Sequence, residues 1–264
     1  MDLAIVQTEA IELVKEVGAF IRKEAEGFQL DKVEKKGFND LVSYVDKQAE
    51  IKLVEGLSKI LPEAGFIAEE GTSDKTGEEY NWIIDPVDGT TNFVHGLPIY
   101  SISVALQKNE TTIAGIVYEI NRDECFHAIE GEKGYLNHHP IHVSKNIVLA
   151  ESLIATGFPY YDFDKMSVYF TILQDLMQNS HGIRRLGSAA VDLAYVACGR
   201  FEGFFEYNLN SWDVAAGAFI VQQAGGKVST FSGGNDFNFG REIIAASPKV
   251  HEEMLHSIQK RWKQ

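Results

Sequence analysis

The sequence of 264 residues predicts an α/β protein, with an α+β arrangement in its first half. Three observations support this prediction. Apolar residues recur at helical spacing near the N-terminus, short apolar runs at close spacing follow them, and later apolar runs alternate with helical patterns. We therefore expect an N-terminal α+β half over residues 1–147 and a C-terminal α/β half over residues 148–264.

The first half begins with two predicted helices. Residues 5–26 and 46–61 each place apolar side chains on one face, and Pro62 follows the second helix. The charged stretch DKVEKKGFND, residues 31–40, predicts an exposed loop between them. Short apolar runs then predict strands, the last three of them antiparallel and joined by short turns: 65–71, 81–89, 100–108, 111–120 and 123–134.

The second half alternates between the two kinds of pattern, which is typical of an α/β layer. Its predicted strands are residues 152–158, 182–188, 200–207 and 242–248. Its predicted helices are residues 164–178, 189–199, 212–226 and 248–262. Gly199 and the pair Gly225–Gly226 mark the ends of two of these helices.

The composition limits the function. The net charge of −14 argues against a nucleic-acid partner, because such a partner requires a basic face. No stretch approaches the roughly 20 apolar residues that a membrane span requires, and the N-terminus lacks the pattern of a signal peptide. We expect a cytoplasmic protein without membrane or nucleic-acid partners.

Acidic residues end or flank several of the apolar segments. They are Asp40, Glu69, Glu70, Asp85, Asp88 and Asp213. Each has an ordinary interpretation taken alone, such as a turn cap, a solvated loop acid or a helix first-turn residue. Gathered together they would repel one another unless cations compensated, and carboxylate oxygens suit Mg²⁺. The set therefore predicts a magnesium site on the α/β layers.

The segment WIIDPVDGTTNF, residues 82–93, carries the clearest local signal. Pro86 stiffens the step between Asp85 and Asp88 and removes a backbone donor. Gly89 allows close backbone approach, and a helix that starts here would present the amides of Gly89 and Thr90 to an anion. Acids for a metal and amides for a phosphate thus lie close together, as metal-assisted phosphoryl transfer requires.

Four motifs in register resemble those of the inositol monophosphatase family of Mg²⁺-dependent, lithium-sensitive phosphatases. DPVDGTTNF, residues 85–93, fits its D-P-x-D-G-T-x-N signature, and WDVAAGAFIVQQAGG, residues 212–226, fits its W-D-x-A-A-G signature. AEEG, residues 68–71, fits the G-E-E element with Ala68 for glycine, and GFNDLVSYVD, residues 37–46, fits D-L-V-T-x-x-D with Ser43 for threonine. The resemblance covers nearly the whole chain.

The resemblance implies a layered α/β/α/β/α sandwich of the sugar-phosphatase type, a homodimer, and two to three Mg²⁺ ions per active site. The implied metal ligands are Glu69, Asp85, the Val87 carbonyl, Asp88 and Asp213, so that most come from the first half. The implied catalytic residues are Asp40 and Thr90, which orient the attacking water, and Glu69. The implied substrate contacts are the Gly89 and Thr90 amides and Glu206. Glu70 keeps two interpretations, a solvated acid or a supporting one.

The expected reaction is hydrolysis of inositol monophosphate by in-line attack of a metal-activated water. The same chemistry on NADP(H), fructose bisphosphate or adenosine bisphosphate stays open, as does an inactive metal-binding scaffold. Substrate choice should depend on Glu206 and on residues 156–162 and 186–190. Tyr160 and Tyr161 could stack a base or pack at the surface, and Arg184 and Arg185 could meet a second phosphate or remain solvated.

Overall fold

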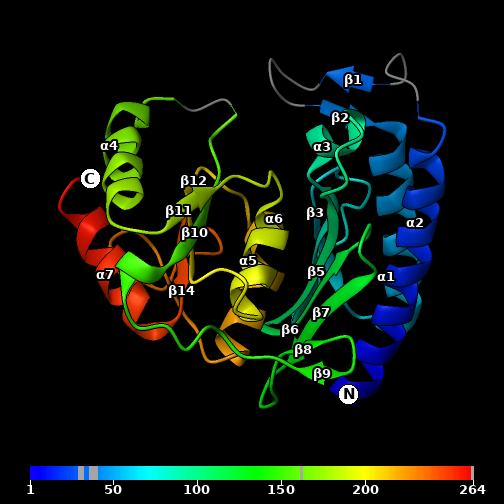
Figure 1. Cartoon of the computed structure of the whole chain (residues 1–264). Helices are drawn as coiled ribbons and strands as arrows, with labels where there is room; N and C mark the ends of the chain where they lie inside the picture. The colour runs from blue at the N-terminus through cyan, green and yellow to red at the C-terminus, as the bar shows by residue number, and fades with distance from the viewer. Residues whose placement is uncertain (29–32, 36–40, 161–162, 263–264) are drawn as a thin grey trace.

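The chain folds into five layers, helices and sheets in alternation (Figure 1). This is a computed structural model, and it describes residues 1–28, 33–35, 41–160 and 163–262. The first layer is the helix pair α1, Leu3–Ala25, and α2, Tyr44–Ile60. Asp2 caps α1 by accepting the amides of Ala4 and Ile5 at 3.1 and 3.3 Å.

The second layer is a seven-stranded sheet in the order β3-β4-β5-β6-β7-β8-β9. The strands β3 and β4 are parallel and every later pair is antiparallel. Helices α1 and α2 cover one face of this sheet, and α6 covers the other. The strands are β3 Gly65–Ala68, β4 Tyr80–Asp88, β5 Ser101–Lys108, β6 Thr111–Glu119, β7 Glu124–Ile129, β8 Tyr135–Leu136 and β9 His139–Pro140.

The third layer is the buried helix pair α5, Ala189–Ala197, and α6, Ser211–Gln223, between the two sheets. Small residues let these helices approach closely. A Cβ on Gly217 would lie 2.6 Å from the Cβ of Leu193, and a Cβ on Gly115 would lie 2.8 Å from the carbonyl oxygen of Ala216. The glycines of α6 and β6 therefore fix how deeply α6 sits between its neighbours.

The fourth layer is a five-stranded sheet in the order β11-β10-β12-β14-β13, and the fifth layer is the outer pair α4 and α7. The bounds are β10 Leu153–Thr156, β11 Gly182–Arg184, β12 Gly203–Tyr207, β13 Lys227–Ser229, β14 Glu242–Ala246, α4 Met166–Gln178 and α7 Pro248–Gln259. A 3-10 turn, Leu149–Glu151, precedes β10. Buried apolar side chains fill the spaces between the layers in three clusters, and the middle cluster spans both sheets and the helix pair between them.

The layered sandwich and the strand–helix alternation were predicted correctly from the sequence. Each sheet draws its strands from one side of residue 148, yet the central apolar cluster combines Ile83 and Val117 with Phe204 and Val214. The division into two halves at residues 147 and 148 stays a prediction.

The prediction of a continuous loop over residues 31–40 was wrong in part. Val33–Lys35 forms β1, which pairs antiparallel with β2, Leu41–Ser43. Strands β8, β9 and β13 were also missed, because two or three residues are too few to show a period.

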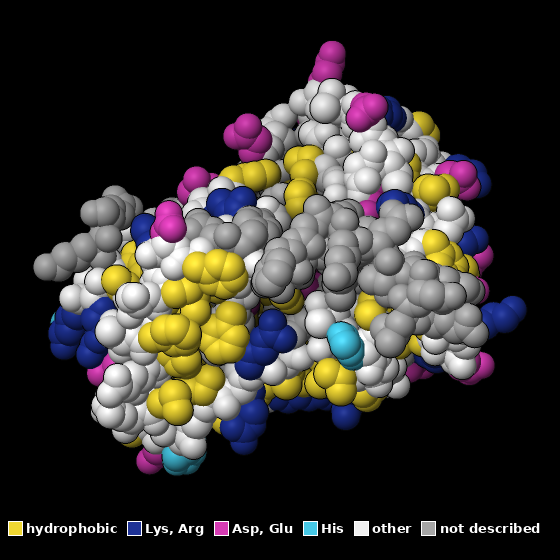
Figure 2. Space-filling model, turned by 90° about the horizontal axis from the view of Figure 1, so that it is seen from above, with side chains coloured by type: hydrophobic (Ala, Val, Ile, Leu, Met, Phe, Trp, Pro, Cys, Tyr) yellow, Lys and Arg dark blue, Asp and Glu magenta, His cyan; other side chains and the backbone are white. Residues whose placement is uncertain are grey.

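Helix α4 exposes an apolar face that we call the α4 surface. Phe170 and Met177 are 53% and 58% exposed, and Phe163, just before the helix, is 52% exposed. Met166 and Leu173 are partly buried and lie between them at helical spacing. Figure 2 shows apolar side chains gathered on the side of the molecule that carries α4.

None of the helices in the described ranges is both long enough and apolar enough to span a bilayer.

Candidate active site

Strand β4 ends in a bulge that carries two acids. Asp85 pairs with Ser103 and Asp88 pairs with Ser101, so Pro86 and Val87 together face a single residue of β5. Proline suits this position because it has no amide to offer the ladder. The amide of Val87 instead donates to Asp85 Oδ1 at 2.9 Å.

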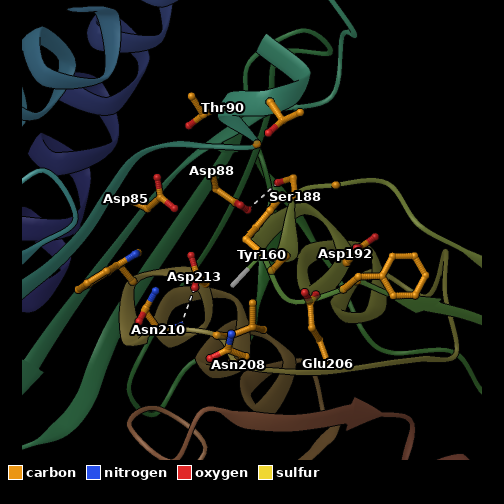
Figure 3. A pocket seen from close by; sticks show the side chains of 18 of the residues that line it. Asp85, Asp88, Thr90, Tyr160, Ser188, Asp192, Glu206, Asn208, Asn210 and Asp213 are labelled. Atoms are coloured by element: carbon orange, nitrogen blue, oxygen red, sulfur yellow. Dashed lines mark hydrogen bonds between the residues drawn. The ribbon is translucent and has the colours of Figure 1, made fainter. Parts of the chain in front are cut away.

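Gly89 turns the chain away from the strand. Its φ of +100° lies in the left-handed region, which glycine adopts without strain, and it caps the short helix α3, Thr90–Val94. The turn places Asp85 and Asp88 on the pocket side of the sheet and Thr90 beside them (Figure 3).

Asp213 reaches the same pocket from the first turn of α6. Its Oδ2 accepts the amide of Asn210 at 2.6 Å, which caps the helix and fixes the carboxylate. The hydroxyl of Ser103 donates to the carbonyl of Trp212 at 3.0 Å and ties this turn to strand β5. The position of Asp213 is therefore set by both the helix cap and the sheet.

Asp85, Asp88 and Asp213 each bring one carboxylate oxygen to within 4.8 Å of the others. Burial raises the pKa of Asp85 well above its usual range, and the charges of Glu69, Asp88 and Asp213 raise it further. Burial likewise raises the pKa of Asp88 to about 6 and that of Asp213 to about 7. Two of the three carboxylates are buried and Asp213 is partly buried. Because a negative charge on one of them disfavours a charge on its neighbours, a hard divalent cation would stabilise the group, and these three residues could hold a metal ion.

Asp88 is also held by the second half of the chain. Its Oδ2 accepts the hydroxyl of Ser188 at 2.6 Å and the amide of Ala190 at 2.7 Å. Ser188 also caps α5 by accepting the amide of Val191 at 3.3 Å. The α5 N-terminus thus orients one oxygen of Asp88. Ser188 lies in the 186–190 stretch that was expected to affect substrate choice, but this contact was not predicted.

Glu69 lies in the loop after β3 and lines the same pocket. Glu50 fixes this loop from α2. The Glu50 carboxylate is fully buried and accepts the amides of Glu70 and Thr72 at 2.7 and 2.8 Å. Glu70 itself does not line the pocket, although its amide anchors the loop that carries Glu69.

Thr90 is positioned by a residue that was not predicted to belong to the site. Its hydroxyl lies 2.8 Å from Asp46 Oδ1 and 3.0 Å from the carbonyl oxygen of Val87, and it can donate to either. Asp46 is fully buried, and its other oxygen accepts the amide and hydroxyl of Ser43 at the start of α2. Asp40, the expected partner of Thr90, lies outside the described residues.

The pocket has a volume of about 420 Å³ and extends beyond the acidic cluster. All the described residues predicted for the site line it: Glu69, Asp85, Val87, Asp88, Gly89, Thr90, Glu206 and Asp213. Their individual roles remain predictions. The pocket therefore gathers into one place side chains and amides from both halves of the chain.

The far end of the pocket contains Glu206, from the end of β12. Burial raises its pKa to about 8, the charge of Asp213 adds to this, and Arg185 opposes it. Arg185 and Tyr160 are exposed but also line the pocket, and a hydrogen bond of 3.4 Å joins Arg185 Nη2 to the Tyr160 hydroxyl. Arg184 is exposed and does not line the pocket, and Tyr161 lies outside the described residues.

The five layers and the carboxylate cluster at the strand and helix ends define a class of α/β/α/β/α proteins with an acidic pocket that could hold a divalent cation. The model of the "Inositol monophosphatase family" matches residues 2–264, and the chain belongs to that family. The resemblance found in the four motifs is thereby confirmed.

Three relatives illustrate the similarity. The chain is 39% identical over 251 residues to "Nus factor SuhB" of Haemophilus influenzae, covering 95% of this chain and 94% of the relative. It is 37% identical over 226 residues to "Inositol-1-monophosphatase" of Mesorhizobium japonicum, covering 85% of each. The crystal structure of "extragenic suppressor protein suhB" from Bartonella henselae superposes with a TM-score of 0.91 at 36% identity, covering 97% of this chain and 98% of that one.

Proposed function

We propose that this protein is a Mg²⁺-dependent phosphomonoesterase whose substrate is inositol monophosphate. The observation that carries the proposal is the convergence of Asp85, Asp88 and Asp213 within 4.8 Å at a pocket that Glu206 also lines. Family membership and the Mesorhizobium relative support the reaction and the substrate.

The proposed metal ligands are Glu69, Asp85, the Val87 carbonyl, Asp88 and Asp213, for two to three Mg²⁺ ions. Bound there, Mg²⁺ supplies positive charge that favours ionised water and neutralises phosphate oxygens. The carbonyl of Val87 has two lone pairs, so a contact with the Thr90 hydroxyl leaves one lone pair for another partner.

The residues of the chain itself position the reactants. The Thr90 hydroxyl donates to Asp46 and keeps lone pairs that could accept a hydrogen bond from the attacking water; as the water proton moved to Thr90, the proton of Thr90 would pass to the Asp46 carboxylate. In our proposal Asp40 takes part in the same step, the Gly89 and Thr90 amides bind the phosphate, and Glu206 binds hydroxyls of the alcohol part. Ser188 and Ala190 already hold the Asp88 side chain in one orientation. Substrate binding therefore costs no further conformational entropy at this residue.

Phosphate release from inositol monophosphate, measured with Mg²⁺ and with a chelator, tests the proposal. The variant Asp88→Asn should lose activity by about 100-fold or more, while Asp74→Asn, an exposed acid in a loop, should keep it. Activity that persists in the chelator, or an Asp88→Asn variant as active as Asp74→Asn, would contradict the proposal. Lithium serves as a further probe, because the family resemblance predicts inhibition.

Other phosphate esters remain candidate substrates, because the metal and phosphate parts of such a site are common to them all. A panel with NADP(H), fructose bisphosphate and adenosine bisphosphate, compared by kcat/KM, ranks them against inositol monophosphate. If kcat/KM for one of these esters exceeds that for inositol monophosphate a hundredfold, that ester is the better substrate. The proposed reaction class would be unchanged.

A second candidate function is a role as a Nus factor, which the name of the Haemophilus relative favours. Such a role could be independent of catalysis, as in a metal-binding scaffold. Complementation of a strain that lacks its own Nus factor SuhB separates the two functions. Rescue by wild type and by Asp88→Asn alike would assign this role to the folded protein and not to its chemistry.

We also propose that the protein is a homodimer that buries the α4 surface. Exposed phenylalanine and methionine side chains at helical spacing are typical of a helix face that contacts a partner. Light scattering should give twice the chain mass for wild type and for Gln174→Glu, an exposed control on the same helix. Phe170→Glu should give the single-chain mass, and a dimer that survives this change would place the interface elsewhere.

A further inference from the structure

Asp192 is a buried carboxyl group in the pocket wall that the proposed reaction does not use. It lies in the first turn of α5 and is only 1% exposed. Its Oδ1 has no hydrogen-bond partner within the described part of the chain. It lines the same pocket as Glu206 but does not belong to the three-carboxylate cluster.

An acid at this position needs an explanation. The surrounding residues of α5 are alanine, valine and leucine, and all of those on its buried side pack between the two sheets. A buried carboxyl oxygen without a partner costs free energy, whereas an apolar side chain here would stabilise the helix packing. The residue is therefore better explained by a partner that enters the pocket than by a role in folding.

The position of Asp192 indicates which part of a substrate it would meet. In Figure 3 Asp88 lies between Asp85 on one side and Asp192 and Glu206 on the other. Asp192 and Glu206 thus lie toward the end of the pocket away from Asp85. A phosphate held at the acidic cluster would direct its alcohol part toward them.

The charges at this end favour a neutral alcohol. Burial raises the pKa of Asp192 well above its usual range, the charges of Glu206 and Asp88 raise it further, and Arg185 opposes them. One exposed guanidinium group thus serves several acids, which leaves little positive charge for a second phosphate. A hydroxyl group can either donate to a carboxyl oxygen or accept from a protonated one, so it suits Asp192 in both states.

We infer that Asp192 is a specificity-determining residue that hydrogen-bonds a hydroxyl group on the alcohol part of the phosphate monoester. The inference rests on the proposed phosphatase function and names a polyhydroxylated alcohol as the class of leaving group. Asp192 and Glu206 then bind two hydroxyls of one polyol from α5 and β12.

The test compares two esters that differ only in hydroxyls. Glycerol 2-phosphate carries two free hydroxyls, and isopropyl phosphate has the same carbon skeleton without them. Wild type, Asp192→Leu and Asp192→Asn are assayed on both esters in Mg²⁺, with Asp74→Asn as the exposed control. Leucine keeps the volume but cannot bond a hydroxyl, whereas asparagine keeps a donor and an acceptor.

We expect Asp192→Leu to lower kcat/KM for glycerol 2-phosphate roughly 10- to 100-fold and to leave isopropyl phosphate within about twofold of wild type. Asp192→Asn should retain most of the activity on both esters. Equal losses on the two esters, or no loss on either, would overturn the inference. If Asp192→Leu fails to fold, as judged by its thermal unfolding midpoint, Asp192→Ala takes its place with the same criteria.

The same assays distinguish a failure of the proposed phosphatase function from a failure of the role assigned to Asp192. Wild-type protein that releases no phosphate from either ester in Mg²⁺ would overturn the proposed function and this inference with it. Wild-type protein that hydrolyses both esters, with a Leu variant that shows no selective loss, would overturn only the role of Asp192.

Discussion

Glu50 lies outside the metal ligands, yet we predict that it sets the affinity for Mg²⁺. It is fully buried on α2 and accepts the amides of Glu70 and Thr72 at 2.7 and 2.8 Å. These two bonds hold the loop that carries Glu69. The change Glu50→Gln keeps the shape of the side chain but leaves only one acceptor oxygen, so one of the two partly buried amides faces an NH₂ group.

An unsatisfied buried amide costs about 1–3 kcal/mol, and a partly buried one lies toward the lower end of that range because water can reach it. The loop can avoid this cost by moving, but it then no longer holds Glu69 beside Asp85. If metal binding must restore the loop, a cost of about 1.4 kcal/mol appears as a roughly tenfold weaker Mg²⁺ affinity. We therefore expect Glu50→Gln to raise the Mg²⁺ dissociation constant between about 5- and 100-fold.

Isothermal titration of Mg²⁺, together with the Mg²⁺ midpoint for phosphate release, measures this effect. Glu55→Gln, an exposed change on the same helix, is the matched control and should bind Mg²⁺ as wild type does. At saturating Mg²⁺ the kcat of Glu50→Gln should approach that of wild type. A variant that is less stable but has an unchanged Mg²⁺ midpoint would refute the reasoning and show that Glu50 supports the fold alone.

Three further predictions concern the pocket. The pKa values of Asp213 and Glu206 in the folded protein are about 7 and about 8, above the values in an unfolded chain. The protonated carboxyl groups therefore stabilise the fold fully below about pH 4, and this contribution is lost as pH rises through the folded-state pKa values. The metal-free protein should therefore show a thermal midpoint that falls from pH 5 to pH 8, and Mg²⁺ should raise the midpoint more at pH 8 than at pH 5.5; a midpoint that rises with pH would contradict this. A Cβ on Gly157 would lie 2.1 Å from Glu206 Oε2, so Gly157→Ala should displace the Glu206 carboxyl group and raise KM for a polyol ester about tenfold or more. Unchanged steady-state kinetics would contradict this and show that the neighbouring side chains move to accept the methyl group. Asp46→Asn should lower kcat about tenfold or more with little effect on the Mg²⁺ midpoint, because it misplaces the Thr90 hydroxyl; a shift in the midpoint alone would assign Asp46 to the metal site instead.

Two buried acids that support the pocket from outside it could have been found from the sequence by a stricter interpretation of helix periodicity. Asp46 and Glu50 occupy the same face of α2 as Ala49, Leu53 and Leu57, which was predicted to be buried. An acid on such a face must have a buried partner, so the pattern contained a signal for both residues. Their partners, Thr90 and the loop after β3, could not be predicted because they are distant in sequence.

The sequence alone determined the features that depend on local order. The periods of apolar residues predicted the helices and long strands, and the acids, proline and glycine of residues 85–90 predicted the end of the strand and the turn that follows it. The bulge in that strand end was seen only in the structure. These features depend on backbone preferences and on neighbours a few residues away, which the sequence states directly.

Only the tertiary structure decided which groups meet. It placed Asp46 on Thr90, Ser188 on Asp88, and Asp192 in the wall of the pocket near Glu206. The physical reason is that these contacts depend on how two sheets and the helices between them pack. Small residues such as Gly217 let neighbouring elements pack in close contact, and so they set how near the side chains on those elements come to one another. No local sequence pattern encodes such a distance between residues that are far apart in the chain.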